Sequence, residues 1–249
     1  MTRYFLQLAY DGSDFHGWQI QHNANTVQAT LDIALSVYLR EKIETLGAGR
    51  TDTGVHASFF VVHFDCNCNN LDENQTTHLY KLNSILPQSI VLKKITKMSD
   101  SANARFDAVS RTYCYYVHQI KNPFLEEYSV YLAGNIDVDL MNEAAKKLFN
   151  YTDFTSFSKL HADVKTNNCN ISEAFWYTNE DQLVFKITAN RFLRNMVRAI
   201  VGTLLDVGRK RITIDDFCKI IDQKDRCCAG KSVAAKGLFL TNIKYPYDI

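Results

Sequence analysis

The chain has 249 residues, of which 46% are hydrophobic and 22% are charged, and its formal net charge is +1 at pH 7. This composition is typical of a folded globular protein, and the near-zero net charge argues against a surface that attracts nucleic acid over its whole extent. No apolar run is long enough to span a bilayer, and the first residues have a strand pattern without a signal peptide's cleavage pattern, so we expect a cytoplasmic protein.

The seven cysteines and seven histidines do not have the spacing of a metal site or a redox pair. The cysteines are odd in number and scattered along the chain, which indicates reduced thiols. We therefore expect no bound metal ion.

The first half of the chain is predicted to alternate strands and helices. A first strand ends in the turn Asp11-Gly12-Ser13, and Asn25 with Gln28 three residues later has the pattern of a helix capping box. The order is strand, helix, strand, strand, helix, strand, with approximate bounds 3–10, 27–38, 44–47, 58–65, 77–86 and 90–98.

The second half is predicted to repeat this order. A two-stranded hairpin is expected around Asn179-Glu180-Asp181, and Gly208 has the position of a helix C-cap. The expected elements are a strand at 111–119, a helix at 138–149, hairpin strands at 171–178 and 183–189, helices at 192–207 and 213–222, and a strand at 237–245.

This order is that of the split β-α-β motif of ferredoxin-like folds. The sequence therefore predicts an α+β protein made of two ferredoxin-like halves, residues 1–103 and 104–249, joined near residues 99–104. We expect the two antiparallel sheets to lie side by side around a central cleft that holds the active site.

The segment Gly47-Ala48-Gly49-Arg50-Thr51-Asp52-Thr53-Gly54-Val55-His56-Ala57 is the strongest candidate for chemistry. Its glycines allow sharp turns that would present Arg50 and Asp52 together at a sheet edge. A nearby guanidinium favours the ionised form of a carboxylate, which can then act as a nucleophile or a base. The alternative is a surface ion pair in a glycine turn. No Gly-Lys-Ser/Thr follows the segment, as a P-loop needs, and the glycine spacing does not fit the dinucleotide fingerprint.

A basic stretch follows in the second half. Asp206 is the single acidic residue between residues 191 and 211, a stretch that contains Arg191, Arg194, Arg198, Arg209, Lys210 and Arg211. An acidic catalyst beside a basic helix would suit a polyanionic substrate, whereas a solvated helix face is the alternative.

With these segments in view, the chain resembles the tRNA pseudouridine synthase A family from end to end. The segments that carry the resemblance are Gly49-Arg50-Thr51-Asp52-x-Gly54-Val55-His56, Tyr10-Asp11-Gly12-Ser13-Asp14-Phe15-His16-Gly17-Trp18-Gln19, Arg111-Thr112-Tyr113-Cys114-Tyr115 and Phe192-Leu193-Arg194-Asn195-Met196-Val197-Arg198. Thr53 stands where the family more usually has alanine, and Thr112 where a basic residue is frequent. These two departures bear on substrate preference more than on activity.

The resemblance implies an enzyme that isomerises uridine to pseudouridine in the anticodon arm of tRNA, at nucleotides 38, 39 or 40. It also implies that no cofactor or metal is used and that the protein acts as a homodimer. Asp52 would be the catalytic aspartate. Its carboxylate would either attack the sugar or the base covalently, or draw a proton from the ribose to give a glycal, and the sequence leaves both routes open.

The resemblance implies roles for further residues. Arg50 would take the space vacated by the flipped base and pair with the aspartate, because a flipped base leaves a gap in the stack. Tyr113 would pack on the flipped base and assist proton transfer from C5, and Arg198 would form an ion pair with Asp52. The other expected substrate-binding residues are Leu238, which would line the uracil pocket, Arg191 and Arg194.

Other residues are left with two interpretations. Trp18 and His16 either touch RNA or pack beneath the active-site loop. Lys159 and His161 either meet tRNA or lie on an ordinary surface.

Two other classes of function compete with this hypothesis. An RNA-recognition motif would need an exposed aromatic strand of defined pattern, which the segment 59–64 lacks because it has no leading basic residue and glycine. A small-molecule enzyme using Arg50 and Asp52 would leave the basic stretch unexplained.

Overall fold

A computed structural model describes residues 1–159 and 166–249. These residues form two compact units: unit 1 comprises Met1–Val109 and Leu240–Ile249, and unit 2 comprises Ser110–Phe239. The joint was predicted near residues 99–104, whereas the chain passes into unit 2 after Val109 and its last residues belong to unit 1.

Hydrogen bonds explain why the last residues of the chain belong to unit 1. The backbone N–H of Val109 donates to the carbonyl of Lys244 over 2.7 Å, and the hydroxyl of Tyr247 donates to the carboxylate of Asp107 over 2.7 Å. The ring of Tyr245 packs edge-on against Phe5 with a centroid separation of 5.6 Å. The C-terminal segment is thereby fixed to the core of unit 1.

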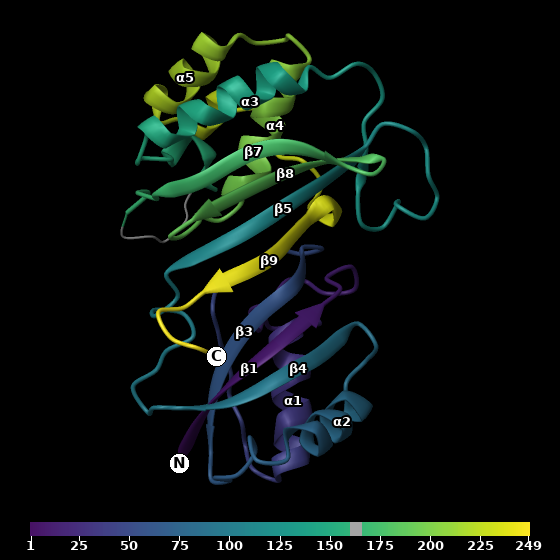
Figure 1. Cartoon of the computed structure of the whole chain (residues 1–249), viewed down its shortest axis with the longest axis vertical. Helices are drawn as coiled ribbons and strands as arrows, with labels where there is room; N and C mark the ends of the chain where they lie inside the picture. The colour runs from purple at the N-terminus through teal and green to yellow at the C-terminus, as the bar shows by residue number, and fades with distance from the viewer. Residues whose placement is uncertain (160–165) are drawn as a thin grey trace. The chain divides into compact units, whose positions relative to one another are not determined.

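The sheet of unit 1 has the strand order β4-β1-β3, and the short strand β2 pairs with β3. All three pairings are antiparallel. The elements are β1 (Thr2–Tyr10), α1 (Val27–Leu39), β2 (Leu46–Gly47), β3 (His56–Cys66), α2 (Gln75–Ile85) and β4 (Ile90–Met98). The last strand, β9 (Leu238–Lys244), begins in unit 2 and continues from Leu240 in unit 1. Figure 1 shows α1 passing behind β1 and β4. The sequence predicted the order and the kind of every element that begins before Val109.

The cap of α1 differs from the prediction. Thr26, and not Asn25, is the N-cap, and its hydroxyl accepts a hydrogen bond from the backbone N–H of Ala29. The predicted capping box is wrong because Gln28 is buried and its side chain donates to the carbonyl of Thr45 instead of to the helix end. A residue that could cap a helix is here used to connect α1 with the segment before β2.

The sheet of unit 2 has the strand order β5-β8-β7, again with antiparallel pairing. Its strands are β5 (Ser110–His118), β7 (Ile171–Asn179) and β8 (Gln182–Ala189), and β6 (Val130–Tyr131) is a short parallel partner of β5 that the sequence did not predict. The helices are α3 (Val138–Lys147), α4 (Met196–Gly208) and α5 (Ile214–Gln223). Figure 1 shows all three on the same side of β7.

The long helix α4 is shorter than predicted. It begins at Met196 and not at 192, because Asn195 has a left-handed conformation with φ 67° that interrupts the helix. Gly208 is the last helical residue and not the cap; Arg209 is the C-cap. A Cβ atom at Gly208 would lie 2.7 Å from the side chain of Met141, so close packing of α4 on α3 explains this glycine.

Apolar side chains form the core of each unit. In unit 1 the fully buried rings include Tyr4, Phe60 and Phe64, while in unit 2 they include Tyr115 and Phe185. Within the two described ranges, the structure contains no helix with the length and apolar character needed to cross a membrane.

One carboxylate is buried in unit 1. Asp32 lies on α1 with 9% of its surface exposed, and it accepts hydrogen bonds from the backbone N–H and the hydroxyl of Thr45 over 3.0 and 2.6 Å. Burial raises the pKa of the Asp32 carboxyl to about 6; the bonds from Thr45 oppose this rise, and the charge of Glu44 adds to it.

The raised pKa of Asp32 leads us to expect that the stability of the protein depends on pH. Because the pKa of Asp32 is higher in the folded state than in an unfolded chain, the folded protein holds the extra proton between about pH 4 and 6, and the free energy of unfolding falls as pH rises through that window. Asparagine does not titrate, so Asp32→Asn should not show this fall. The difference in the free energy of unfolding between Asp32→Asn and wild type should therefore shift in favour of the variant by on the order of 1–2 kcal/mol from pH 4 to pH 7.5.

Thermal unfolding of both proteins at the two pH values would measure this change. Asp14→Asn, which removes an exposed carboxyl from the same unit, provides the control for the general effect of losing one carboxylate. An Asp32→Asn difference that is the same at both pH values would contradict the prediction.

Candidate active site

The loop between β2 and β3 carries Arg50 and Asp52. At its start the N–H of Ala48 donates to the carbonyl of Val61, and near its end the N–H of Val55 donates to the carbonyl of Asp52 over 3.1 Å. Gly54 makes the last turn possible with φ 73°. The loop is therefore closed at both ends by backbone hydrogen bonds.

The segment between β1 and α1 lies directly against this loop. The N–H of Trp18 donates to the carbonyl of Thr51, and the N–H of Gly54 donates to the carbonyl of Phe15. The approach requires Gly17, which has φ 88° and whose Cβ atom, if present, would lie 2.5 Å from the carbonyl oxygen of Thr51. Gly17 thus supports the backbone that presents Asp52, and sequence reasoning did not single it out.

Gly12 and His56 fix the other end of the same segment. A Cβ atom at Gly12 would lie 2.1 Å from the carbonyl oxygen of Val55, so only glycine fits there. The N–H of Gly12 donates to Nδ1 of the buried His56 over 3.0 Å. His56, the last polar residue of the glycine-rich motif, is thus tied to the opening segment of the chain.

A cluster of aromatic rings lies under the loop. Trp18 is 1% exposed, its ring is 4.4 Å from that of Phe60, and the Tyr10 ring lies 5.6 Å from Phe60. The hydroxyl of Tyr10 shares a 2.9 Å hydrogen bond with the hydroxyl of Thr51. Of the two interpretations of Trp18, packing beneath the active-site loop is therefore correct, whereas His16 is exposed.

Arg50 and Asp52 differ in their surroundings. Arg50 is exposed, and its Nε donates to Oε1 of Gln19 over 3.1 Å. Asp52 is half-buried. The contact between Arg50 and Gln19 was not predicted from the sequence.

In unit 2, Tyr113 lies on β5. It is half-buried, and its ring meets that of Phe192 edge-on with a centroid separation of 5.1 Å and an interplanar angle of 87°. Such an edge-to-face contact is a favoured geometry for two aromatic rings and helps to fix the orientation of the Tyr113 ring.

Arg198 lies in the first turn of α4. Its Nε donates to the carbonyl of Val233 over 2.7 Å, and the N–H of Val233 donates back to the carbonyl of Arg198. This bond uses one N–H of the guanidinium, which has four more. Arg198 is half-buried. Because Val233 belongs to the segment that follows α5, the hydrogen bond to its carbonyl orients the Arg198 side chain against that segment.

Glycine residues allow that segment to approach α4. A Cβ atom at Gly202 would lie 2.0 Å from the carbonyl oxygen of Lys231, and the N–H of Gly230 donates to the hydroxyl of Thr203. At the start of α4 the side-chain amide of Asn195 donates to the hydroxyl of Ser232 over 2.7 Å. Contacts along the helix therefore fix the segment that orients Arg198.

Arg191 and Arg194 precede α4. Arg191 is half-buried and its N–H donates to the side chain of Asn190, while Arg194 is exposed and its carbonyl accepts from the N–H of Lys159. Lys159 itself is exposed. His161 lies outside the described residues.

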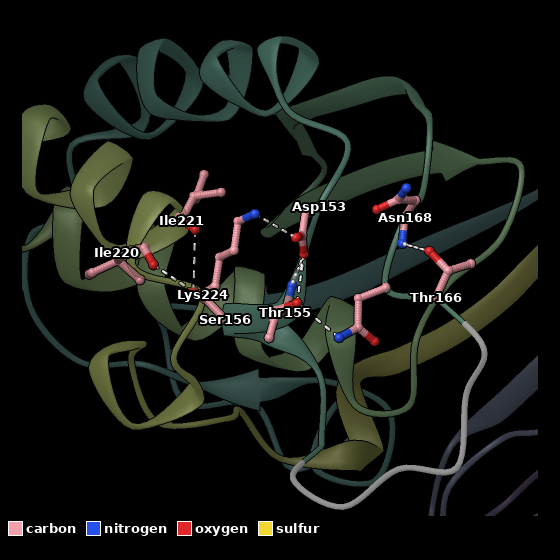
Figure 2. Close-up of polar contacts among 9 residues, drawn as sticks. Asp153, Thr155, Ser156, Thr166, Asn168, Ile220, Ile221 and Lys224 are labelled. Atoms are coloured by element: carbon pink, nitrogen blue, oxygen red, sulfur yellow. Dashed lines mark hydrogen bonds and ion pairs between the residues drawn. The ribbon is translucent and has the colours of Figure 1, made fainter.

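Figure 2 shows how the chain before Lys159 is anchored. The carboxylate of Asp153 accepts from the N–H and the hydroxyl of Thr155 and forms a 2.9 Å ion pair with Lys224, while the hydroxyl of Ser156 donates to the carbonyl of Ile220 over 2.6 Å. The 3₁₀ turn Thr155–Phe157 is thereby attached to the end of α5. Lys159, whose backbone N–H donates to the carbonyl of Arg194, therefore follows closely on a turn that is held in place by hydrogen bonds.

The basic residues of this stretch are spread along the length of α4 and beyond its end. Arg198 and Arg209 stand at opposite ends of α4, about 16 Å apart along its axis. Lys210 pairs with Asp137 and Arg211 with Asp206, each over 3.1 Å. The basic residues after the helix are thus used in local ion pairs, and those before and within its first turn are the candidates for substrate contact.

Leu238, the first residue of β9, is 6% exposed. Among the side chains that the structure describes, no group of three or more His, Cys, Asp or Glu is arranged to hold a metal ion.

Comparison with known proteins identifies the family. A family model described as tRNA pseudouridine synthase matches residues 8–107 and 144–246. The chain belongs to the tRNA pseudouridine synthase family. A relative named tRNA pseudouridine synthase A from Bacteroides thetaiotaomicron is 54% identical over 100% of this chain and 93% of its own length.

Two further relatives also match nearly the whole chain. A tRNA pseudouridine synthase A from Bacteroides fragilis is 53% identical over 100% of this chain and 98% of its own length, and one from Bacillus subtilis is 39% identical over 96% and 97%. The match with this family of isomerases therefore includes both structural units.

The family match covers the candidate residues unevenly. Arg50 and Asp52 fall in its first matched range, and Arg198 and Leu238 fall in the second. Tyr113 lies between the two ranges. The match with the tRNA pseudouridine synthase family thus includes Arg50, Asp52, Arg198 and Leu238, whereas Tyr113 is a candidate from the local strand motif alone.

Proposed function

We propose that this protein isomerises uridine to pseudouridine in the anticodon arm of tRNA, at nucleotides 38, 39 or 40, without a cofactor or a metal ion. The observation that carries the proposal is the family match, which includes the segment presenting Arg50 and Asp52 on a firmly supported loop. The relatives' name, tRNA pseudouridine synthase A, supports tRNA as the substrate. The anticodon arm follows from the resemblance of the motifs.

In the proposed reaction the bond between ribose C1′ and uracil N1 breaks, the base rotates, and a bond forms between C1′ and C5. The proton on C5 is lost and N1 gains one, so no outside reagent is consumed. The Asp52 carboxylate acts in one of two ways: it adds covalently to the nucleoside, or it removes a proton from the ribose to give a glycal. Both routes need an ionised carboxylate.

The target base must leave the helical stack, which costs a few kcal/mol. We assign Arg50 to the vacated space, because an exposed guanidinium on the catalytic loop can occupy a gap and contact phosphate or base. Leu238 is assigned to the uracil pocket, and Arg191 and Arg194 to the tRNA backbone.

Arg198 is proposed to pair with Asp52 and to hold its charge. Its Nε is fixed by Val233, and a guanidinium with one N–H already bonded loses less freedom when it binds a carboxylate. The resemblance supplies the pairing, and the anchoring of Nε makes it physically reasonable.

Tyr113 is proposed to pack on the flipped base and to assist the proton transfer from C5. The edge-on contact with Phe192 leaves this ring oriented for stacking. If the hydroxyl carries the proton, Tyr113→Phe should lower kcat by about a hundredfold with little change in tRNA affinity. Single-turnover kinetics measure this; full activity of the phenylalanine variant would leave stacking as the only role.

We further propose that each unit is a ferredoxin-like half and that the protein acts as a homodimer in the cytoplasm. The antiparallel order β4-β1-β3-β2 in unit 1 and the related order β5-β8-β7 in unit 2 support the ferredoxin-like assignment. Sedimentation analysis of the purified protein tests the dimer.

The direct test of function uses wild-type protein and unmodified tRNA transcripts without added metal or nucleotide. Chemical labelling of pseudouridine followed by primer extension should give stops at nucleotides 38–40 in transcripts that carry uridine there. Wild-type protein that produces no stop in the anticodon arm would refute the proposed reaction. Transcripts with cytidine at these positions provide the control.

A further inference from the structure

The side chain of Arg50 is joined to the interior of unit 1 through two glutamines. Nε of Arg50 donates to Oε1 of Gln19 over 3.1 Å, and Nε2 of Gln19 donates to Oε1 of Gln28 over 3.1 Å. Arg50 and Gln19 are exposed, whereas Gln28 is 9% exposed on α1. We call Arg50, Gln19 and Gln28 the glutamine relay.

The contacts of the buried Gln28 determine which atoms of the relay donate and which accept hydrogen bonds. Oε1 of Gln28 also accepts the backbone N–H of Ile20 over 3.1 Å, and Nε2 of Gln28 donates to the carbonyl of Thr45 over 2.7 Å. A reversed amide would place N–H against N–H and carbonyl against carbonyl, so a single orientation satisfies all partners. Gln19 must then donate inward, and its oxygen faces Arg50.

Asp32, one turn further along α1, holds the far side of this arrangement. It accepts both the backbone N–H and the hydroxyl of Thr45, which keeps Thr45 beside the helix and its carbonyl available to Gln28. The same face of α1 thus binds the segment before β2 and the segment after Trp18. The first of these segments leads through β2 into the loop that carries Arg50 and Asp52, and the second lies against that loop. Neither contact involves a residue of the family motif around Asp52.

An arginine side chain on a surface loop has many rotamers, and fixing it has an entropic cost. A hydrogen bond to Nε that exists before substrate binds reduces that cost, because the guanidinium already points in one direction. An acceptor at Nε also leaves the terminal nitrogens of the guanidinium directed away from the relay.

We propose that Gln28 is a positioning residue that orients the guanidinium of Arg50 through Gln19 for its task at the flipped uridine. This proposal rests on the proposed function for the task, but the relay is a property of the protein alone. It predicts that the glutamines act on catalysis only by way of Arg50.

The first test measures the relay without activity. In the 28.5 kDa protein, ¹⁵N relaxation should show that the motion of the Arg50 Nε–H group is restricted. In Gln19→Met and in Gln28→Met this group should become more mobile. Gln21→Met is the matched control, because Gln21 lies in the same segment but donates to the carbonyl of His16 and is not part of the relay. Unchanged motion of Arg50 in both relay variants would overturn the proposal.

The second test measures single-turnover rates on unmodified tRNA. Gln19→Met should lower the rate about tenfold with the tRNA affinity within twofold of wild type, and combined with Arg50→Lys it should cause no further loss. Gln28→Met should follow the same pattern, with thermal unfolding confirming that the buried substitution leaves the protein folded. Losses that are equal in the wild-type and the Arg50→Lys backgrounds, or no loss at all, would refute a positioning role.

The two tests separate this proposal from the proposed function. A wild-type protein that forms no pseudouridine refutes the reaction, whatever the motion of Arg50. An active wild type whose rate is insensitive to a mobilised Arg50 refutes the positioning role alone.

Discussion

Replacing Asp52 by asparagine is expected to abolish pseudouridine formation while leaving tRNA affinity within several fold of wild type. Asparagine keeps the shape of the side chain but is neither a base nor a nucleophile at neutral pH, so both proposed routes fail. We expect the single-turnover rate to fall by about a thousandfold or more.

The structure predicts that this loss is chemical and not structural. The loop is held by backbone hydrogen bonds, including one accepted by the carbonyl of Asp52, and these persist when the side chain changes. Thermal unfolding of Asp52→Asn should therefore resemble that of wild type. Asp14→Asn, an exposed aspartate in the neighbouring segment, should keep full activity. Residual turnover within tenfold of wild type would remove Asp52 from its catalytic role.

Replacing Arg198 by alanine should have the second largest effect. Loss of one charged donor from an active site lowers rates by about a hundredfold to a thousandfold, and we expect a decrease in kcat of that size. The variant also loses the bond to the carbonyl of Val233, which should reduce the free energy of unfolding by about 1 kcal/mol.

Two further variants separate the charge of Arg198 from its anchoring. Arg198→Lys keeps the positive charge but loses the planar guanidinium that can bond Val233 and a carboxylate together, so its rate should lie between those of wild type and the alanine variant. Arg209→Ala, at the other end of α4, removes a similar charge about 16 Å away and should leave the rate near wild type. Unchanged kinetics of Arg198→Ala would place this residue outside the active site.

Much of the fold could be predicted because local patterns and the structure agree. Strand β4 has the predicted bounds, and the hairpin of β7 and β8 turns through Glu180, whose φ of 51° suits a tight connection. In these segments hydrophobic periodicity and turn residues act over a few positions. The predictions failed where a distant contact outweighed a local preference. Gln28 bonds Thr45 instead of capping α1, and Gly208 is a helical residue packed against Met141 instead of the C-cap of α4.

The sequence by itself determined that this is a mixed α and β protein with a compact motif around Arg50 and Asp52, because those features depend on residues close together in the chain. Only the tertiary structure decided that Trp18 packs under the loop that carries Arg50 and Asp52, that Gly17 lets the neighbouring backbone approach this loop, and that Arg50 is bonded to Gln19. Such contacts join residues separated by tens of positions. Their geometry depends on how strands and helices pack, which no local pattern encodes.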